Sequence, residues 1–336
     1  MKRPAIALAM LPERTQHVLP PELLARLDQL GVLLDPTPMT TFTGDRARRL
    51  LAETEILVTG WGAPLFDANA LASTPNLRLV AHAAGTVKGI VGPWVFDGGV
   101  RVTHAAQANA LPVAEFTLAA IIFAGKSVFR FRDLYVAHRD RTLTHPLQAE
   151  PIGNYRRVVG IVGASRIGRR VIELLRPFDY EILLYDPMVT EGEAGDLRVE
   201  KVDLDTLFRR ADIVSLHAPS LPQTRHMVDA RRLSLMKDGG TLINTARGAL
   251  IDEDALLAAL KTGVIDAVID VTDPEIPGRS SPFYDLPNVF LTPHIAGAIG
   301  MERARLGETV IDEIARFIDG RPLRYEVRAQ DLERMA

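Results

Sequence analysis

The chain has 336 residues, of which 47% are hydrophobic and 24% charged, and its formal net charge is −3. This length suits two domains, and the small net charge argues against nucleic acid or an anionic membrane surface as a partner. The chain contains no cysteine, which excludes disulfides, thiolate zinc sites and thiol nucleophiles and is compatible with a reducing, cytoplasmic location. We predict no metal site.

Residues 1–19 place two basic residues before a short apolar run, as a signal peptide also would. Pro12, Glu13 and Arg14 end that run early, and no small-residue cleavage site follows. We therefore expect residues 5–10 to form a buried first strand. No run reaches the ~18 apolar residues that a membrane span needs.

Strand-like and helix-like segments alternate along the first third of the chain. We predict strands at 6–10, 55–60, 77–83 and 100–105, with helices at 21–31 and 44–54. The first of these helices has a proline near its start and a glycine at its end, which are typical helix boundaries. This rhythm predicts a parallel sheet with helices on both faces.

Residues 109–129 are apolar on all sides, which predicts a buried helix. We expect Asn109 to cap its N-terminus and Pro112 to lie in its first turn. The following residues, 130–157, are polar and loop-rich and show no clear core period. We interpret them as an arm that reaches across a partner.

A second series of apolar runs follows this arm. We predict its strands at 158–163, 181–186, 211–219, 239–246, 267–272 and 288–293, and a last helix at 300–320. The pattern predicts an α/β chain of two doubly wound parallel-sheet units joined near residue 108, with the last helix returning to the first unit. We find no internal repeat and no low-complexity tract.

The stretch VVGIVGASRIGRRV, residues 158–171, joins a buried strand to a helix through a glycine-rich turn. Dinucleotide-binding turns follow the pattern G-x-G-x-x-G, whose glycines allow a tight turn, close approach of the pyrophosphate and packing of helix on strand. Gly163 and Gly168 match the first and third glycines, and Ser165 replaces the second. The helix N-terminus would supply N–H groups to a pyrophosphate, and Arg166 would add positive charge.

Asp186 ends the next predicted strand, 18 residues after Gly168. A carboxylate at this position can accept hydrogen bonds from both ribose hydroxyls and would repel a 2′-phosphate, which favours NAD over NADP. The alternative is an ordinary strand-to-helix turn with small packing residues, followed by a surface aspartate.

Three ionisable residues follow later strands: Arg247 in INTARGALID, Glu275 in IDVTDPE and His294 in LTPHIAGA. Ligands of open α/β sheets bind outside the carboxyl ends of the strands, so we expect these side chains to converge in one cleft. A guanidinium can hold a carboxylate and a neighbouring keto oxygen, an imidazolium can protonate that oxygen, and a carboxylate favours the charged imidazole. The set fits hydride transfer to a 2-keto acid.

Each of the three also has a structural alternative. Arg247 could cap a helix or pair with Asp252, Glu275 could be solvated in its proline-rich loop, and His294 could be a turn residue without catalytic function.

The chain resembles the NAD-dependent D-isomer-specific 2-hydroxyacid dehydrogenases, which include glyoxylate/hydroxypyruvate reductases and phosphoglycerate dehydrogenases, over nearly its whole length. The matching segments are NALPVAEFTLA, VGIVGASRIGR, YDP, SLHAPSLPQTRHMV, MKDGGTLINTARGALIDEDALLAAL, IDVTDPE and LTPHIAG. The resemblance implies a Rossmann NAD-binding domain at 108–296 and a flavodoxin-like substrate domain at 1–107 with 297–336. It also implies a homodimer formed through the NAD-binding domain and the 130–157 arm.

The resemblance further implies residue roles. Arg247 would bind the substrate carboxylate and keto oxygen, His294 would be the acid/base, and Glu275 would be its charge partner. Asp270 would face the nicotinamide amide. The other implied cofactor contacts are Gly163, Ser165, Arg166, Ile167, Gly168, Asp186, His217, Pro219, Thr224, Thr245, Ala246 and Gly297.

In similar enzymes the loop at 81–91 gives backbone N–H groups to the substrate carboxylate. The residues assigned in this way are Ala84, Gly85 and Thr86. Val87 and Lys88 stand where the family commonly has an acidic or amide residue, so Lys88 could meet a second acidic group on a larger substrate or point to solvent. Ala296 stands where a glycine is common.

Two other functions occur on a similar fold. Phosphite dehydrogenases are not excluded by the three ionisable residues, whereas formate dehydrogenases carry glutamine where this chain has Glu275. Some relatives are NAD-sensing corepressors, but no added peptide-binding or disordered region is evident here. The leading hypothesis is NADH-linked reduction of a 2-keto acid, reversible as oxidation of a D-2-hydroxy acid.

Overall fold

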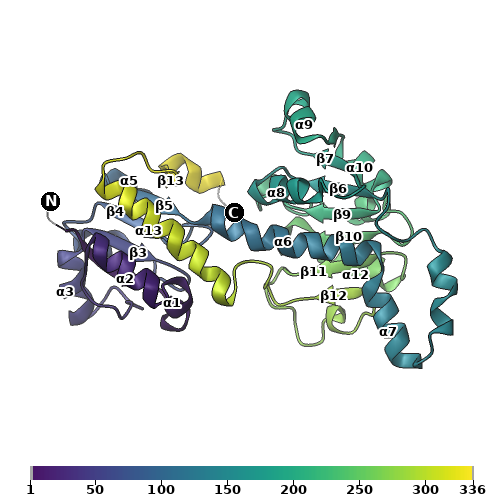
Figure 1. Ribbon diagram of the computed structural model, residues 1–336, viewed down its shortest axis with the longest axis horizontal. Helices are drawn as coiled ribbons and strands as arrows, with labels where there is room; N and C mark the ends of the chain where they lie inside the picture. The colour runs from purple at the N-terminus through teal and green to yellow at the C-terminus, as the bar shows by residue number, and fades with distance from the viewer. Residues whose placement is uncertain (1–2, 335–336) are drawn as a thin grey trace. The chain divides into compact units, whose positions relative to one another are not determined.

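The computed structural model describes residues 3–334, which divide into two compact units (Figure 1). The first unit contains the chain up to Ala110 and again from Ala298, and the second spans Leu111–Gly297. Residues 1–2 and 335–336, which the predicted first domain includes, lie outside the described residues.

The first unit is built on a six-stranded sheet with the order β13-β5-β4-β3-β1-β2. Its strands are β1 (Ala5–Ala9), β2 (Val32–Leu33), β3 (Ile56–Thr59), β4 (Leu79–His82), β5 (Arg101–His104) and β13 (Glu326–Val327). β1 to β5 are parallel, and β13 pairs antiparallel with β5. The order 2-1-3-4-5 is that of flavodoxin-like sheets, which confirms the predicted fold class.

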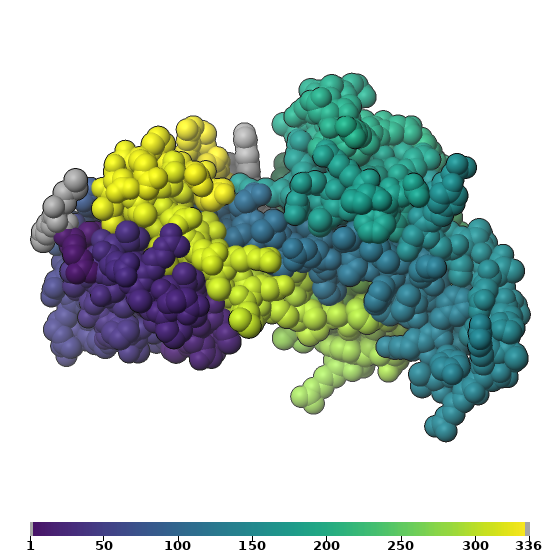
Figure 2. Space-filling model, viewed as in Figure 1, coloured from purple at the N-terminus to yellow at the C-terminus, as the bar shows by residue number. Residues whose placement is uncertain are grey.

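Helices cover both faces of this sheet (Figure 1). They are α1 (Pro12–Val18), α2 (Pro21–Leu30), α3 (Asp45–Glu53), α4 (Ala68–Ala72), α5 (Pro93–Asp97) and α13 (Ala304–Ile318), with 3-10 turns η6 (Gly300–Arg303) and η7 (Ala329–Arg334). Side chains alternate along β1: Ile6 and Leu8 pack in a cluster with α2 and α13, whereas Ala7 and Ala9 pack in a cluster with α3 and α5. Figure 2 shows the yellow α13 segment against the purple N-terminal helices of the same unit.

The second unit is built on a seven-stranded sheet with the order β12-β11-β10-β9-β6-β7-β8. Its strands are β6 (Val158–Val162), β7 (Glu181–Tyr185), β8 (Glu200–Lys201), β9 (Ile213–Leu216), β10 (Thr241–Asn244), β11 (Asp266–Ile269) and β12 (Val289–Leu291). All neighbours pair in parallel. Counted from β6, this is the Rossmann order 3-2-1-4-5-6 with one strand added, which confirms the predicted nucleotide-binding fold.

Helices also cover both faces of the second sheet, so a strand such as β9 is buried on both sides: Ile213 packs in one hydrophobic cluster and Val214 in the other. The helices are α8 (Arg166–Leu175), α9 (Glu191–Leu197), α10 (Leu204–Arg210), α11 (Ala230–Leu233) and α12 (Glu253–Lys261), with 3-10 turns η3 (Pro222–Thr224), η4 (Gly248–Leu250) and η5 (Pro282–Tyr284). The strands thus deliver their carboxyl ends to one edge of the sheet, where the predicted site residues lie.

Helix α6 (Ala106–Gly125) begins three residues earlier than predicted. The Nδ1 atom of His104 accepts a hydrogen bond from its first N–H at 2.9 Å. Asn109 therefore lies inside the helix, where its side chain accepts from the Ala298 N–H, and Pro112 lies in the helix interior. Both predictions for this terminus are wrong. By length and composition α6 could cross a membrane, but half of its apolar window is buried within the protein, and core helices pass the same test.

The arm at 130–157 contains more regular structure than predicted. Helix α7 (Val128–His138) enters it and is followed by the 3-10 turns η1 (Thr142–Thr144) and η2 (Pro146–Ala149). The prediction failed because α7 has no buried residue and hence no apolar face for a periodicity to mark. The strands β2, β8 and β13 were not predicted either, because two residues show no period.

Gly307 of α13 packs on the end of α1, where a Cβ would overlap the carbonyl oxygen of Val18. We expect Gly307→Ala to destabilise the first unit by about 1–3 kcal/mol, because backbone cannot move aside as a side chain can. Urea unfolding measures the loss. The control is Gly195→Ala in α9, where nothing lies within 4 Å of the added Cβ. Equal losses in the two variants would contradict the packing argument.

Candidate active site

The glycine-rich turn lies between β6 and α8 at the carboxyl edge of the second sheet. Gly163 has φ = +99°, and a Cβ on it would lie 2.7 Å from the backbone nitrogen of Ala218. A Cβ on Gly168 would overlap the carbonyl oxygen of Gly163. The first position therefore requires glycine for its backbone conformation and the second for close packing of helix on strand.

Ser165 is the N-cap of α8, and its Oγ accepts a hydrogen bond from the Gly168 N–H at 3.3 Å. The N–H groups of Arg166 and Ile167, in the first turn, have no partner within the helix. The Arg166 side chain is exposed. This end of α8 therefore offers N–H donors, the positive end of the helix dipole and a guanidinium, which together suit a phosphate.

Asp186 directly follows β7, the neighbour of β6. Its carboxylate accepts hydrogen bonds from the N–H groups of Ala164, at 2.7 Å, and Met188, at 2.8 Å. The first of these bonds ties the carboxylate to the glycine-rich turn. Each oxygen retains a second lone pair, so ribose hydroxyls can bind here without breaking either bond.

His217 is buried beside the turn, and burial lowers the pKa of its imidazole to about 3. Its Nε2 lies 2.9 Å from the Oγ of Ser215, whereas its Nδ1 is buried without a hydrogen-bond partner among the described residues. A neutral imidazole with one unsatisfied nitrogen is a group that a bound ligand can complete.

The other predicted cofactor residues contribute backbone or loop support. The Thr224 hydroxyl donates to the carbonyl of Pro219 at 2.6 Å, and the Thr245 hydroxyl lies 3.1 Å from that of a threonine in α6. Ala246 and Gly297 have no polar side chain, so only their backbones can form hydrogen bonds with a ligand.

Arg247 follows β10 in an extended conformation and is half-buried. Its Nη1 donates to the carbonyl of Ala246 at 2.6 Å, and Asn244 Nδ2 donates to the Arg247 carbonyl at 3.0 Å. Burial lowers the pKa of Arg247, and the negative charge of Glu275 opposes that shift, so the two groups interact. Gly248 permits this turn, because a Cβ there would overlap the backbone that follows β11.

Glu275 and His294 are in direct contact through a hydrogen bond between Glu275 Oε1 and His294 Nδ1. Their side chains are 56% and 47% exposed, so a substrate can reach them. The hydroxyl of Thr272 holds the loop that carries Glu275, since it lies 2.7 Å from the carbonyl oxygen of Pro274 and 3.1 Å from that of Glu275. The second unit thus brings Glu275 and His294 into direct contact, and the charge of Glu275 acts on the Arg247 guanidinium without a direct hydrogen bond.

Asp270, which is 2% exposed, supports the histidine. Its carboxylate accepts from the Thr292 hydroxyl at 2.6 Å and from the N–H groups of Ile295 and Ala296 at 2.8 and 2.9 Å. Its carbonyl accepts from the His294 N–H at 2.9 Å. His294 has φ = +53°, a conformation that needs such support in a residue other than glycine.

In the first unit, the predicted substrate loop 84–86 follows β4 and rests on His82. This imidazole is fully buried, with Nδ1 2.9 Å from the Thr59 hydroxyl, and it hydrogen-bonds the Thr86 backbone. Burial, and secondly the nearby His104, lowers the pKa of His82 to about 4, so the ring is neutral at neutral pH. It therefore connects the end of β3 to the loop without adding charge.

Asn244 and His82 were not among the predicted site residues. Each is the polar last residue of an apolar strand, β10 and β4 respectively. That position is the one sequence signal that could have identified them, because side chains at the carboxyl ends of parallel strands face the loops that bind ligands.

Residues 120–296 match the family model "D-isomer specific 2-hydroxyacid dehydrogenase, NAD binding domain". The chain is 34% identical to glyoxylate reductase of Korarchaeum cryptofilum, over 76% of this chain and 77% of that protein. It is 29% identical to D-3-phosphoglycerate dehydrogenase of Methanocaldococcus jannaschii, over 84% of this chain but 53% of that protein, so it spans about half the length of that relative. The chain belongs to the D-isomer specific 2-hydroxyacid dehydrogenase family.

Solved structures agree on the fold of this dehydrogenase family member. The apo form of D-mandelate dehydrogenase from Rhodotorula graminis has a TM-score of 0.79 to it at 24% identity, over 97% of this chain and 98% of that one. The matched family model makes the second unit an NAD-binding domain. Its residues fit that cofactor: Gly163 and Gly168 permit the tight turn and the close packing of helix on strand, α8 directs N–H groups outward, and His217 has an unsatisfied nitrogen.

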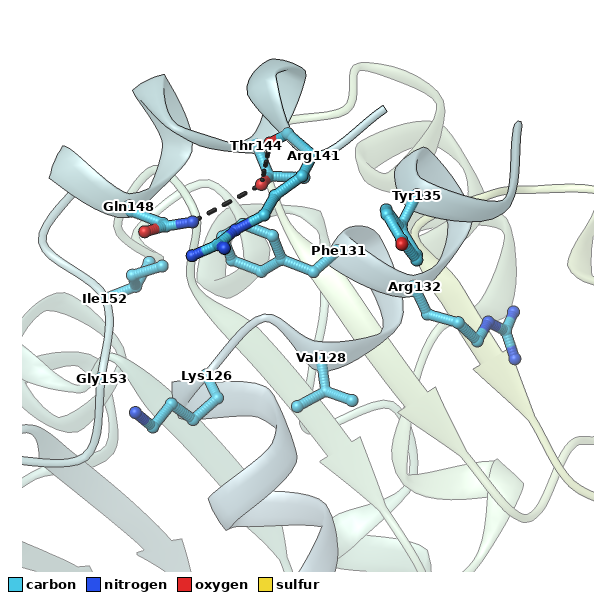
Figure 3. Close-up of a pocket in the computed structure, with 10 residues that line it drawn as sticks. All are labelled: Lys126, Val128, Phe131, Arg132, Tyr135, Arg141, Thr144, Gln148, Ile152 and Gly153. Carbon is cyan, nitrogen blue, oxygen red and sulfur yellow. Dashed lines mark hydrogen bonds between the residues drawn. The ribbon is translucent and has the colours of Figure 1, made fainter. Parts of the chain in front are cut away.

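A hollow of about 830 Å³ lies on the arm of this chain (Figure 3). Its lining mixes apolar and cationic side chains: Lys126, Val128, Phe131, Arg132, Tyr135, Arg141, Thr144, Gln148, Ile152 and Gly153. Two hydrogen bonds join residues of this lining: Gln148 Nε2 donates to Thr144 Oγ1 at 3.5 Å, and Thr144 Oγ1 donates to the Arg141 carbonyl at 2.7 Å. None of the predicted cofactor or substrate residues lines it.

The N-cap geometry yields a prediction for the serine that replaces the second glycine of the motif. We expect Ser165→Gly to leave the Kd for NADH within about tenfold of wild type, ~1.4 kcal/mol, because the cap bond is long and glycine is itself an acceptable N-cap. Fluorescence titration with NADH measures the Kd. A much larger loss would mean that the hydroxyl binds a phosphate oxygen directly.

Proposed function

We propose that the protein is an NAD-linked reductase of small 2-keto acids that also works in reverse as a D-2-hydroxyacid dehydrogenase. The observation that carries this proposal is the His294–Glu275 hydrogen bond beside Arg247 in a unit that matches an NAD-binding domain. The relatives' names, glyoxylate reductase and D-3-phosphoglycerate dehydrogenase, agree with a small acidic substrate.

Three side chains perform the chemistry in this proposal. The cofactor, when bound as NADH, supplies the hydride that reaches the keto carbon. Arg247 holds the substrate carboxylate and polarises the keto oxygen through its planar guanidinium. His294, with Nδ1 facing Glu275, donates the proton on its other nitrogen to that oxygen, which gives the 2-hydroxy acid. The Glu275 carboxylate, hydrogen-bonded to Nδ1, fixes the orientation and the tautomer of the imidazole for this step.

Substrate and cofactor binding follow from the same assignments. We assign the pyrophosphate to the N-terminus of α8 and the adenosine ribose to Asp186, whose charge disfavours the 2′-phosphate of NADPH. The substrate carboxylate would also bind N–H groups of the loop 84–86 in the first unit, which His82 holds in place. A cytoplasmic location stays a prediction.

Steady-state kinetics test the catalytic assignment. We expect His294→Gln and Arg247→Ala each to lower kcat/KM by about 100-fold or more, because each removes a group that acts on the reacting carbonyl. The assay uses glyoxylate, hydroxypyruvate and pyruvate, with NADH and NADPH in parallel. Wild-type kcat/KM in either variant would overturn the assignment. NAD reduction by phosphite alone would favour phosphite oxidation, and tight NADH binding without any turnover would favour a sensing role.

We also propose that a second copy of the chain covers the arm. Three of its large apolar side chains are exposed, Tyr135 at 56%, Val136 at 68% and Tyr155 at 67%, and a partner subunit would bury them. We expect wild type to sediment as a dimer and Val136→Glu to shift it to monomer, while Val32→Glu, at a 45% exposed site in β2 of the first unit, leaves the dimer intact. A monomeric wild type, or equal effects of both variants, would contradict this.

A further inference from the structure

Two arginines of the first unit flank one indole ring. The guanidinium carbon of Arg14, in α1, lies 5.9 Å from the ring centroid of Trp61, and that of Arg303, in η6, lies 5.7 Å from it. The backbone holds this arrangement, because the Leu11 N–H donates to the Trp61 carbonyl at 3.0 Å. Arg303 also donates to the Ala298 carbonyl at 3.3 Å. We call Arg14, Trp61 and Arg303 the Trp61 cluster.

The Trp61 cluster lacks a counter-ion. Among residues 3–334 no carboxylate forms an ion pair with either arginine, although both are only partly exposed. Burial and, secondly, the charge of Arg14 lower the pKa of Arg303, so bringing the two cations together costs free energy. An anion that bound between them would remove this cost.

The other arginines that stack on an aromatic ring in this unit are different. Arg78 and Arg101 lie over Phe317 at 5.0 and 6.0 Å, but each has a carboxylate partner, Glu55 at 3.8 Å and Glu326 at 2.6 Å respectively. Stacking on a ring therefore does not by itself leave an arginine without a counter-ion in this fold. The Trp61 cluster differs from the Phe317 pair in this respect.

The Trp61 cluster lies at the same sheet edge as the loop 84–86. β3 and β4 are parallel neighbours with Thr59 opposite His82, so Trp61 and Ala84, each two residues further on, leave the sheet side by side. Neighbouring strands lie about 4.8 Å apart. One small molecule can therefore reach from the loop to the Trp61 cluster.

We propose that Arg14 and Arg303 bind a second acidic group of the substrate, so that the preferred substrates are 2-keto acids with a carboxylate or phosphate at their far end. This rests on the proposed function, which assigns the loop 84–86 to the first carboxylate. Guanidinium groups bind either kind of oxyanion in two-point fashion, and the Trp61 ring restricts their orientation and excludes water on one side.

Selectivity between substrates tests the proposal. The measured quantity is the ratio of kcat/KM for 2-oxoglutarate or 3-phosphohydroxypyruvate to kcat/KM for glyoxylate. We expect Arg14→Gln with Arg303→Gln to lower this ratio by about tenfold or more, since two charged hydrogen-bond donors are lost. The matched control is Arg78→Gln, which removes a stacked arginine just before β4, at the opposite sheet edge, and should leave the ratio unchanged. The two substrates distinguish a carboxylate site from a phosphate site.

If no keto acid is turned over, the proposed function is overturned, but the Trp61 cluster can still be tested by ligand binding. Succinate and glycerol 3-phosphate, which cannot be reduced, are titrated into the NADH-loaded protein by calorimetry. At least tenfold weaker binding of either dianion to the double variant than to wild type and Arg78→Gln supports the Trp61 cluster as an anion site. An unchanged selectivity ratio, or, without turnover, unchanged or absent dianion binding, overturns it.

Discussion

The buried carboxylate of Asp270 is the constraint on which the active-site geometry depends. An aspartate that is 2% exposed is stable only if its oxygens are bonded, and here Thr292, Ile295 and Ala296 supply the donors. Those donors belong to the segment around His294, so satisfying the carboxylate also fixes the left-handed backbone of the histidine. Because Asp270 must be hydrogen-bonded where it is buried, it fixes the position of His294, the residue proposed as the acid/base.

Most of the fold could be predicted because strands buried on both faces are continuous apolar runs. All ten predicted strands are present, and the two strand orders agree with the predicted fold classes. The failures share a physical cause: the interaction that decides each of these features is made with residues outside the local segment, or is missing from it. The start of α6 depends on His104, a residue before the helix, which accepts a hydrogen bond from the first N–H of the helix. Asn109 accepts a hydrogen bond from the N–H of Ala298, which is nearly two hundred residues away in the sequence. α7 buries nothing, so no period marks it.

The candidate site divides in the same way. Arg247, Glu275 and His294 could be predicted because each follows a strand, and parallel strands end together at one edge. Asn244 hydrogen-bonds the backbone of Arg247, and His82 hydrogen-bonds the backbone of Thr86, so their roles appear only once these hydrogen bonds are known. Ser165 lies between these cases. The glycine-rich turn identifies it, but its role as the N-cap of α8 follows from the hydrogen bond that its Oγ accepts from the Gly168 N–H. The sequence therefore predicts the position of the proposed catalytic side chains better than that of the side chains that support them.

Several arginines of this chain have a carboxylate partner, whereas the arginines proposed to bind ligands have none within the part of the chain that the structure describes. Arg26, Arg101 and Arg210 each lie within ion-pair distance of a carboxylate, which offsets their charge inside the folded chain. Arg247 is half-buried, and the charge of Glu275 acts on it without a direct ion pair. The Trp61 cluster holds two cations, and no carboxylate among residues 3–334 forms an ion pair with either. A partly desolvated cation without a partner raises the free energy of the folded state. An anionic ligand that pairs with the cation lowers the free energy of the folded state, so the electrostatic cost present in the free protein adds to the favourable free energy of binding.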